Sequence, residues 1–495
     1  MTDSTTPNTA QPRALRVAVV GAGPAGVYAA DLLTKSEAAV SGQLELSIDL
    51  FDRYPAPYGL IRYGVAPDHP RIKGIVTALH KVLDRGDIRF FGNVDYGTDL
   101  DLADLREHYD AVIFATGAIK DADLNIPGVE LAGSFGAADF VSWYDGHPDV
   151  PREWPLEAKE IAVIGNGNVA LDVARVLSKH ADDLLTTEIP ENVYRGLKNS
   201  PVTDVHVFGR RGPAQVKFTP LELRELSHSH DVDIVLYPED FEFDEASDQA
   251  VRTNNQTKTM VGTLTNWLVE QEDREGKPGA SRRLHLHFLH APVEITAGSG
   301  GQDGQVAGIK FERQELDGTG QVRGTGEFVE YPVQAVYRAV GYFGSALPDV
   351  EYDGSRGVIP NDEGRVLDAA GRAVSGLYAT GWIKRGPVGL IGHTKGDALE
   401  TVNHLLSDRE ALPAAQRPEE ESVVQLLEAR GVEYTTWEGW LKLDEHEKEL
   451  GAAYGPVETP RGPAERERVK VVAREHMVAV SRPAAAAALA ADNVL

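Results

Sequence analysis

One pattern that occurs twice constrains the fold more than any other feature: a short apolar run, a glycine-spaced turn and then apolar residues at helical spacing. The first copy has RVAVV at 16–20 and GAGPAG at 21–26, and the second has EIAVI at 160–164 and GNGNVA at 165–170. A short apolar run before such a turn is typical of a buried parallel strand that leads into a helix. The sequence therefore predicts an α/β protein with two Rossmann-type βαβ units.

Composition excludes several classes of protein and of site. The chain has 495 residues and no Cys, so it holds no disulfide, thiolate zinc site, cysteine-bound iron–sulfur cluster or redox dithiol. The net charge of −27 argues against nucleic acid or an anionic membrane as the main partner. No apolar run reaches the roughly 18 residues of a membrane-spanning helix. The first 14 residues are polar, without the apolar region of a signal peptide, so we expect a cytoplasmic protein.

The first glycine-spaced turn has the features of a dinucleotide site. Gly21, Gly23 and Gly26 fit G-x-G-x-x-G, which allows a tight turn and a close backbone approach to a pyrophosphate at the helix N-terminus. Asp52 ends the next apolar run, where a carboxylate can accept hydrogen bonds from ribose hydroxyls. A purely structural turn with a solvated Asp is the alternative, and the strand before the turn argues against it.

The second turn differs from the first in the residues that come after the next strand. The run VHVF at 205–208 leads through Gly209 to Arg210 and Arg211, where an NAD site would place an acid. An acid would repel a 2′-phosphate, whereas guanidinium groups hold it by charge-assisted hydrogen bonds. We therefore assign NADP(H) to the second unit and, by difference, FAD to the first. A solvated basic turn is the alternative explanation of the two arginines.

Longer motifs carry a family resemblance. They are PYGLIRYGVAPDHP at 57–70, GNGNVALDVAR at 165–175, RRGP at 210–213 and GWIKRGPVGLIG at 381–392. With these motifs, in this order over roughly residues 15–410, the chain resembles the adrenodoxin-reductase-like ferredoxin–NADP reductases. These are two-domain flavoproteins that bind FAD and NADP(H).

The resemblance implies a domain plan. A discontinuous FAD-binding domain would comprise residues 15–117 and 334–410, with an NADP-binding domain at 118–333 between its two parts. We expect residues 1–14 to be disordered. Residues 411–495 have an acidic helical stretch, two Trp and an Ala-rich end. We expect them to form a C-terminal extension of two helices, outside the family core and of unknown role.

The resemblance also implies the residues of each nucleotide site. Two departures from the family pattern stand out: Ala122 replaces a usual Arg, so that one NADP contact is missing or comes from Lys120, and His393 adds an imidazole near a helix start. The FAD residues are Gly21, Gly23, Ala25, Gly26, Asp52, Leu60, Val94, Trp382, Gly389, Leu390 and Ile391. The NADP(H) residues are Asn166, Gly167, Asn168, Val169, Arg210, Arg211, Glu222 and Gly389.

Two residues are candidates for a catalytic role. His69 stands between Pro67 and Pro70, and the resemblance places it beside the contact of nicotinamide and flavin, paired with Glu225. We expect this pair to orient the nicotinamide, because hydride transfer needs positioning more than acid–base help. A solvated loop His is the alternative. Glu222 has an alternative of its own, since TPLE at 219–222 fits a helix capping box.

A metal site is not expected. The histidines of HLHFLH at 285–290 alternate along a predicted strand, and His228 and His230 stand at a helix end. Neither group has companion carboxylates at metal-ligand spacing in the sequence, so packed or surface histidines are the favoured interpretation.

The predicted activity is hydride transfer from NADPH to FAD, followed by single-electron transfer to a separate, acidic iron–sulfur ferredoxin. An NADPH-dependent flavin oxidase or monooxygenase, and a non-catalytic NADP(H)-binding subunit, are the alternatives. Because the chain is acidic, an acidic ferredoxin requires a local basic face near the flavin. The candidates for this face are Arg252, Lys258, Arg282, Arg283 and Lys384.

Overall fold

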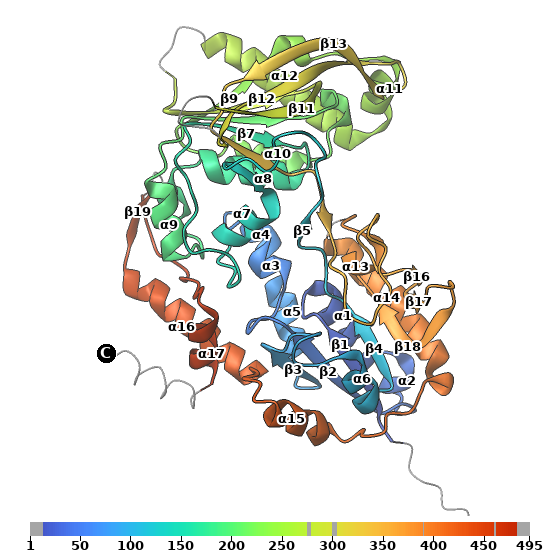
Figure 1. Cartoon of the computed structure of the whole chain (residues 1–495). Coiled ribbons are helices and arrows are strands. Elements are labelled where there is room, and N and C mark those ends of the chain that lie inside the picture. Colours follow the sequence, from blue (N-terminus) through green and yellow to red (C-terminus); the bar gives the residue numbers. More distant parts are fainter. Residues whose placement is uncertain (1–12, 275–278, 299–303, 390, 460–461, 483–495) are drawn as a thin grey trace, which may run out of the picture.

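A computed structural model describes residues 13–274, 279–298, 304–389, 391–459 and 462–482. These residues form two layered α/β units, one above the other in Figure 1, with the last part of the chain running along one side of both. The predicted disordered start falls almost entirely outside the described residues, as does the Ala-rich end. No helix in the described part of the chain is long and apolar enough to cross a membrane.

The lower unit is built on a seven-stranded sheet in the order β16-β17-β18-β4-β1-β2-β3. β1 lies in its interior and pairs in parallel with β2 and β4, with Val17 opposite Ile48 and Ala111. Strands β18, β4, β1, β2 and β3 are parallel, with helices on both of their faces as a parallel sheet requires, whereas β17 pairs antiparallel with β16 and β18. The strands are β1 (Leu15–Val20), β2 (Leu46–Asp52), β3 (Ile88–Gly92), β4 (Ala111–Phe114), β16 (Asn361–Asp362), β17 (Arg365–Leu367) and β18 (Ala373–Ala379).

The upper unit has a parallel sheet in the order β6-β14-β7-β8-β10-β9 and a three-stranded antiparallel sheet, β11-β12-β13. The strands are β6 (Ser134–Gly136), β7 (Glu160–Ile164), β8 (Asp204–Phe208), β9 (Val232–Leu236), β10 (Arg282–His287), β11 (His290–Ala297), β12 (Val306–Leu316), β13 (Val322–Tyr331) and β14 (Ala335–Arg338).

The structure moves one predicted domain boundary. Strand β14 pairs with β6 and β7 of the upper sheet, so the chain returns to the lower unit after Arg338 and not at residue 334. An apolar run shows that a strand is buried but not which sheet it joins, which explains the error. The two connections between the units lie side by side, because β5 (Lys120–Asp121) pairs with β15 (Tyr342–Phe343).

Helices pack around both sheets. In the lower unit α1 runs from the first glycine turn and packs on α14; in the upper unit α8 runs from the second turn. The helices are α1 (Pro24–Thr34), α2 (Glu37–Val40), α3 (Leu60–Tyr63), α4 (Pro70–Lys73), α5 (Val76–Leu83), α6 (Leu102–His108), α7 (Ala137–Tyr144), α8 (Asn168–Ser178), α9 (Glu191–Lys198), α10 (Pro220–Leu226), α11 (Glu245–Thr253), α12 (Asn255–Arg274), α13 (Trp382–Arg385), α14 (Ile391–Asp408), α15 (Glu420–Ala429), α16 (Trp437–Tyr454) and α17 (Arg474–Ser481).

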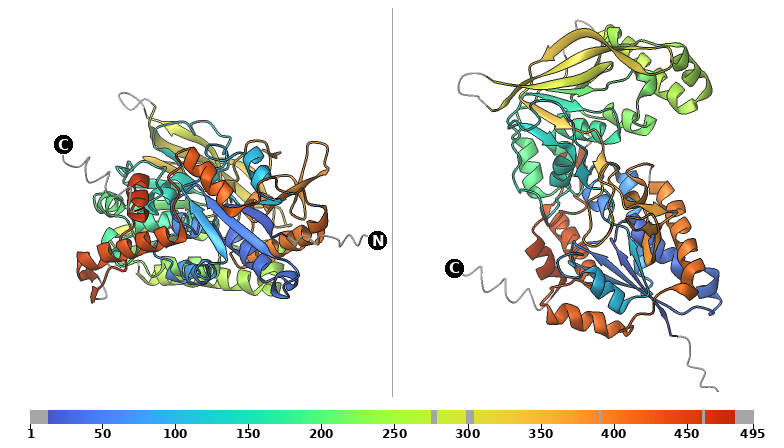
Figure 2. Two further views of the ribbon diagram at one scale, coloured as in Figure 1. Left: turned by 90° about the horizontal axis from the view of Figure 1, so that it is seen from below. Right: turned by 45° about the vertical axis from the view of Figure 1, so that its right-hand side comes forward.

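The C-terminal extension is part of the lower core and also reaches the upper unit. Trp440 and Met477 are buried with Val17 and Leu79 in one apolar cluster, and Val423 packs in a second. A hairpin of β19 (Val457–Thr459) and β20 (Gly462–Ala464) contacts the short helix Ala181–Leu184 of the upper unit. In the right-hand view of Figure 2 the extension, drawn in red, lies beside both units. The described part of the extension thus holds α15, α16 and α17 and a hairpin, more than the two predicted helices.

Candidate functional site

The first glycine turn forms a tight cradle at the end of β1. Gly21 has φ +113°, and a Cβ there would overlap the carbonyl oxygen of Ala115, while one at Gly26 would overlap the carbonyl oxygen of Gly21. Gly23, in contrast, would place a Cβ no closer than 3.8 Å to its neighbours. The buried Thr116 Oγ1 has no hydrogen-bond partner in the described structure. A tight glycine turn, with open space at Gly23 and an unpartnered hydroxyl at Thr116, is the geometry that a bound dinucleotide requires.

Asp52 lies beside this turn at the end of β2, as predicted. Its two carboxylate oxygens accept hydrogen bonds from the backbone N–H groups of Ala22 (2.7 Å) and Tyr54 (2.9 Å). Burial raises the pKa of Asp52 to about 6, against the opposing effect of these hydrogen bonds. Val94 is held next to it, because the Val94 N–H donates to the Asp52 carbonyl oxygen.

The remaining predicted FAD residues lie on two further elements. Leu60 begins α3, and Trp382 begins α13, which follows the positive-φ Gly381 close to Ala25. Gly389 has φ +87° and lies against the His393 side chain. Leu390 falls outside the described residues, and Ile391 is the first residue of α14.

The second turn repeats the design of the first. Gly165 has φ +144°, and a Cβ there would overlap the Ala339 carbonyl oxygen, whereas Gly167 has no neighbour within 4 Å of such an atom. Asn168 begins α8, and its side chain accepts a hydrogen bond from the Thr219 N–H at 2.9 Å. The Asn166 carbonyl oxygen accepts from the Lys217 N–H. These contacts place residues 166–169 beside the start of α10, which carries Glu222.

The two arginines stand past the end of β8. Arg210 is exposed and Arg211 is half-buried, with a 3.3 Å hydrogen bond to Gln321. Gly209, just before them, lies against the Asn166 side chain, so the turn that carries both arginines borders the cradle. This surface position fits a phosphate-binding role.

His69 lies where the two units meet, 3% exposed. Its Nε2 is 2.7 Å from Glu222 and 2.9 Å from Asp172. Burial disfavours the charged imidazole, but the hydrogen bonds to Asp172 and Glu222 prevail and raise the pKa of His69 to about 9. The neighbouring Asp68 pairs with Arg175 at 2.8 Å.

The predicted pairing of His69 with Glu225 is wrong. Glu225 instead lies 3.6 Å from His228, near the exposed end of α10. Glu222, one turn earlier, is 3% exposed and faces His69. The capping interpretation of Glu222 is half right: its N–H donates to the Thr219 side chain, but its carboxylate binds His69. A local pattern cannot tell which turn of a short helix faces another domain.

The sequence reasoning missed Asp172 and Arg175. Both are buried in α8, where they pair with each other at 3.0 Å and with His69 and Asp68 across the domain interface. The sequence does contain an indication of their burial, because Asp172 and Arg175 are opposite charges at i and i+3 in a mostly apolar helix.

The five cations expected to form a basic face do not share one. Lys384 is buried and pairs with Asp397 at 3.1 Å, and Arg283 pairs with Asp204. Arg282 donates to the Lys179 carbonyl oxygen at 2.7 Å. Arg252 and Lys258 belong to α11 and α12 at the far end of the upper unit in Figure 1. The presence of Lys and Arg in the sequence does not predict a basic face, because acidic partners can neutralise them within the fold.

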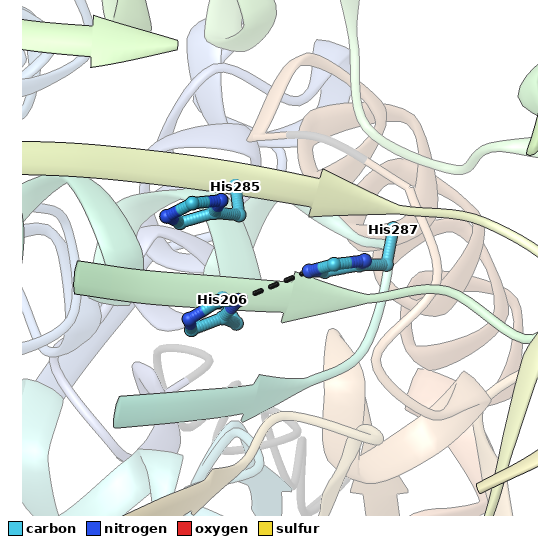
Figure 3. Close-up of side chains that lie close together, drawn as sticks. All are labelled: His206, His285 and His287. Carbon is cyan, nitrogen blue, oxygen red and sulfur yellow. Dashed lines mark hydrogen bonds between the residues drawn. The ribbon is translucent and has the colours of Figure 1, made fainter. Parts of the chain in front are cut away.

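The histidines of the upper sheet are packed rather than exposed. In Figure 3 the rings of His206, His285 and His287 lie nearly parallel, with His206 and His285 stacked at 4.1 Å. Their nitrogens lie within 4.8 Å of one another but already bind other groups: His206 contacts His287 at 3.0 Å, and His285 contacts Asp204 and Tyr237. Burial lowers the pKa of all three, and to about 4 for His285. We call this group the histidine stack.

Comparisons with known proteins agree with this geometry. Residues 15–206 match the family model of pyridine nucleotide-disulphide oxidoreductases, although this chain has no Cys. NADPH-ferredoxin reductase FprA of Mycobacterium tuberculosis is 40% identical over 451 residues, which cover 89% of this chain and 95% of that protein. The mitochondrial NADPH:adrenodoxin oxidoreductase of Arabidopsis thaliana is 36% identical over 90% of this chain and 92% of its own length.

A solved structure extends the match to the whole fold. Mycobacterium tuberculosis FprA in complex with NADPH has a TM-score of 0.82 and 37% identity, covering 95% of this chain and 100% of that one. Residues 1–410 alone could not supply these shares, so the prediction that residues 411–495 lie outside the family core is wrong. The chain belongs to the adrenodoxin-reductase-like ferredoxin–NADP reductases, a family of two-domain FAD- and NADP(H)-dependent flavoproteins.

Proposed function

We propose that this protein oxidises NADPH and reduces a separate iron–sulfur ferredoxin through bound FAD. The observation that carries the proposal is the pair of glycine cradles, one on each sheet, with His69 of the lower unit bonded to Asp172 and Glu222 of the upper unit between them. When bound, FAD supplies a hydride acceptor that can release electrons singly. The cluster must belong to the partner, because this chain has no Cys to hold one.

The residues of the chain would bind, orient and shield. The cradle at residues 21–26 holds the FAD pyrophosphate, with Asp52 toward the ribose, and the cradle at 165–170 holds that of NADP(H). Arg210 and Arg211 bind the 2′-phosphate. His69, held by Asp172 and Glu222, orients the nicotinamide. If the His69→Ala variant binds NADPH and reduces the flavin as fast as the wild type, this role is refuted.

An anaerobic titration tests the function. Purified protein should show a flavin absorption band, which NADPH bleaches far faster than NADH does, and ferredoxin should then restore it. A colourless protein would favour a non-catalytic NADP(H)-binding subunit. Steady peroxide formation from NADPH in air, at a rate that ferredoxin does not alter, would favour an oxidase or monooxygenase.

Two finer statements rest on the sequence. An acidic ferredoxin requires a basic face near the flavin other than the five scattered cations; with such a face turnover falls as salt rises, and a flat salt dependence would count against an acidic partner. The cytoplasmic location is tested by fractionating cells of the source organism and blotting each fraction for the protein.

A further inference from the structure

The segment of residues 58–73 lies between the two nucleotide sites and carries both Leu60 and His69. Its helices α3 and α4 have four residues each, too short to be stable in isolation. Its conformation must therefore come from the elements packed against it. The upper unit holds its second half, since Asp68 pairs with Arg175 and with Lys179 at 2.6 Å.

The C-terminal extension holds the first half. Arg62 is 5% exposed and makes two hydrogen bonds to the fully buried Glu447 of α16, one of them 3.0 Å long. The Trp440 ring lies 5.1 Å from the same guanidinium and contacts the Tyr58 ring edge-on at 5.6 Å. Two residues of one helix of the extension thus bind two residues of this segment.

A second contact joins three parts of the chain. The buried Lys470 donates to the carbonyl oxygen of Arg62 and pairs at 2.7 Å with Glu188 of the upper unit. Glu188 also pairs at 2.6 Å with Lys73 from the end of α4. Lys73 in turn donates to the Ile61 carbonyl oxygen at 3.2 Å. One partly buried carboxylate therefore binds a cation of the segment and a cation of the extension.

Stability alone does not explain this arrangement. Buried ion pairs add little net stability over apolar residues of similar volume, because each charge loses its hydration. They do impose one geometry, since a displaced partner leaves an unpaired charge in the interior. The contacts of Glu447 and Lys470 therefore fix the position of the segment more than they stabilise the fold.

We propose that the C-terminal extension is a positioning element: Glu447 and Lys470 fix residues 58–73, and so set where Leu60 and His69 stand between the two nucleotides. Both are positioning residues that act through Arg62, Glu188 and the backbone of the segment. The consequence for catalysis rests on the proposed function, whereas the effect on the segment itself does not.

The test compares Glu447→Gln and Lys470→Met with a matched control, Arg430→Gln. Arg430 anchors α15 of the same extension to Asp104 at 2.6 Å, away from the segment. In the FAD-loaded proteins, amide hydrogen exchange of residues 58–73 should rise about tenfold in the first two variants and stay at the wild-type rate in the control. Strand β1 should remain protected in all three.

Kinetics supply the second measurement. At saturating NADPH, flavin reduction should slow about tenfold in Glu447→Gln and Lys470→Met, with flavin content unchanged and KM within about threefold. Wild-type exchange in the segment would overturn the proposal. So would exchange that rises equally in β1, because the extension would then stabilise the whole unit. Faster segment exchange with an unchanged reduction rate would overturn the catalytic consequence alone, and an absence of any NADPH reaction in the wild type would refute the proposed function instead.

Discussion

The two nucleotide sites share one backbone design and differ in the residues past the second strand of each unit. Gly21 and Gly165 both have positive φ, and both press against a carbonyl oxygen of a neighbouring segment, Ala115 or Ala339. After the next strand the lower unit has a buried acid, Asp52, and the upper unit has arginines at the surface. The common cradle suits any dinucleotide, so we propose that the residues at the end of the second strand of each unit select which dinucleotide binds.

The two units also differ in the side chains that pack on them. The lower core takes in Trp440 and Met477 of the extension, which are apolar and do not titrate. The upper sheet carries the histidine stack, whose rings are buried and whose pKa values are lowered. Similar sheets thus acquire different sensitivities to pH from the side chains that cover them.

Substitution of the equivalent glycines should give the largest effects and separate the two sites. Gly21→Ala should purify without flavin, because a Cβ overlaps backbone in a left-handed conformation. Gly165→Ala should keep its flavin and lose more than about 100-fold in the rate of reduction by NADPH. Absorbance spectra and anaerobic NADPH titrations measure both. Full flavin content in Gly21→Ala would contradict the assignment of the first site.

Removal of the arginines should change selectivity next. The double variant Arg210→Ala/Arg211→Ala should lose about 100-fold in kcat/KM for NADPH and little for NADH, since charge-assisted hydrogen bonds contribute about 1.5–3 kcal/mol each. Arg195→Ala, an exposed arginine paired with Glu191, is the control. Equal losses with both nucleotides would mean that these arginines do not read the 2′-phosphate.

The two glutamates of α10 offer a sharper comparison. Glu222→Gln should lower the pKa of His69 from about 9, by roughly one unit, because it removes a bonded carboxylate. Since the pKa of His69 is raised on folding, its stabilising effect is complete below about pH 6.5 and is lost as the pH rises through about 9. NMR titration of labelled histidine measures the shift. Glu225→Gln should leave it unchanged, and equal shifts would restore the pairing of His69 with Glu225.

The smallest effect concerns the histidine stack. Because burial lowers the pKa of all three rings, and that of His285 to about 4, the unfolded chain takes up protons below about pH 6.5 that the folded chain does not, and stability falls as the pH drops from about 6.5 toward 4. His287→Phe should reduce this loss by about 1–2 kcal/mol between pH 7 and pH 5, as measured by urea unfolding. His228→Phe, at a 60% exposed side chain, should not reduce it.

Features that depend on a few adjacent residues could be predicted from the sequence. The glycine turns, the strands before them and the helices after them follow from the conformations that a few adjacent residues allow. The structure has these elements where they were predicted, with Asp52 at the end of β2 and Arg210 past the end of β8. Asp172 and Arg175 were available as buried charges in an apolar helix but were not singled out. The role of Glu222 was left open between a cap and a nucleotide contact, and its carboxylate binds His69.

Contacts between distant segments required the tertiary structure. Strand β14 joins the upper sheet, and His69 binds Glu222 rather than Glu225. Arg283 and Lys384 form ion pairs with Asp204 and Asp397. The extension lies against α3 through Arg62 and Glu447, residues 385 positions apart. The sequence by itself determined two glycine turns, each between a strand and a helix, and their order, because the backbone conformation of a six-residue turn depends on its own residues. Only the tertiary structure decided which charges meet, because a buried ion pair depends on where two whole elements pack.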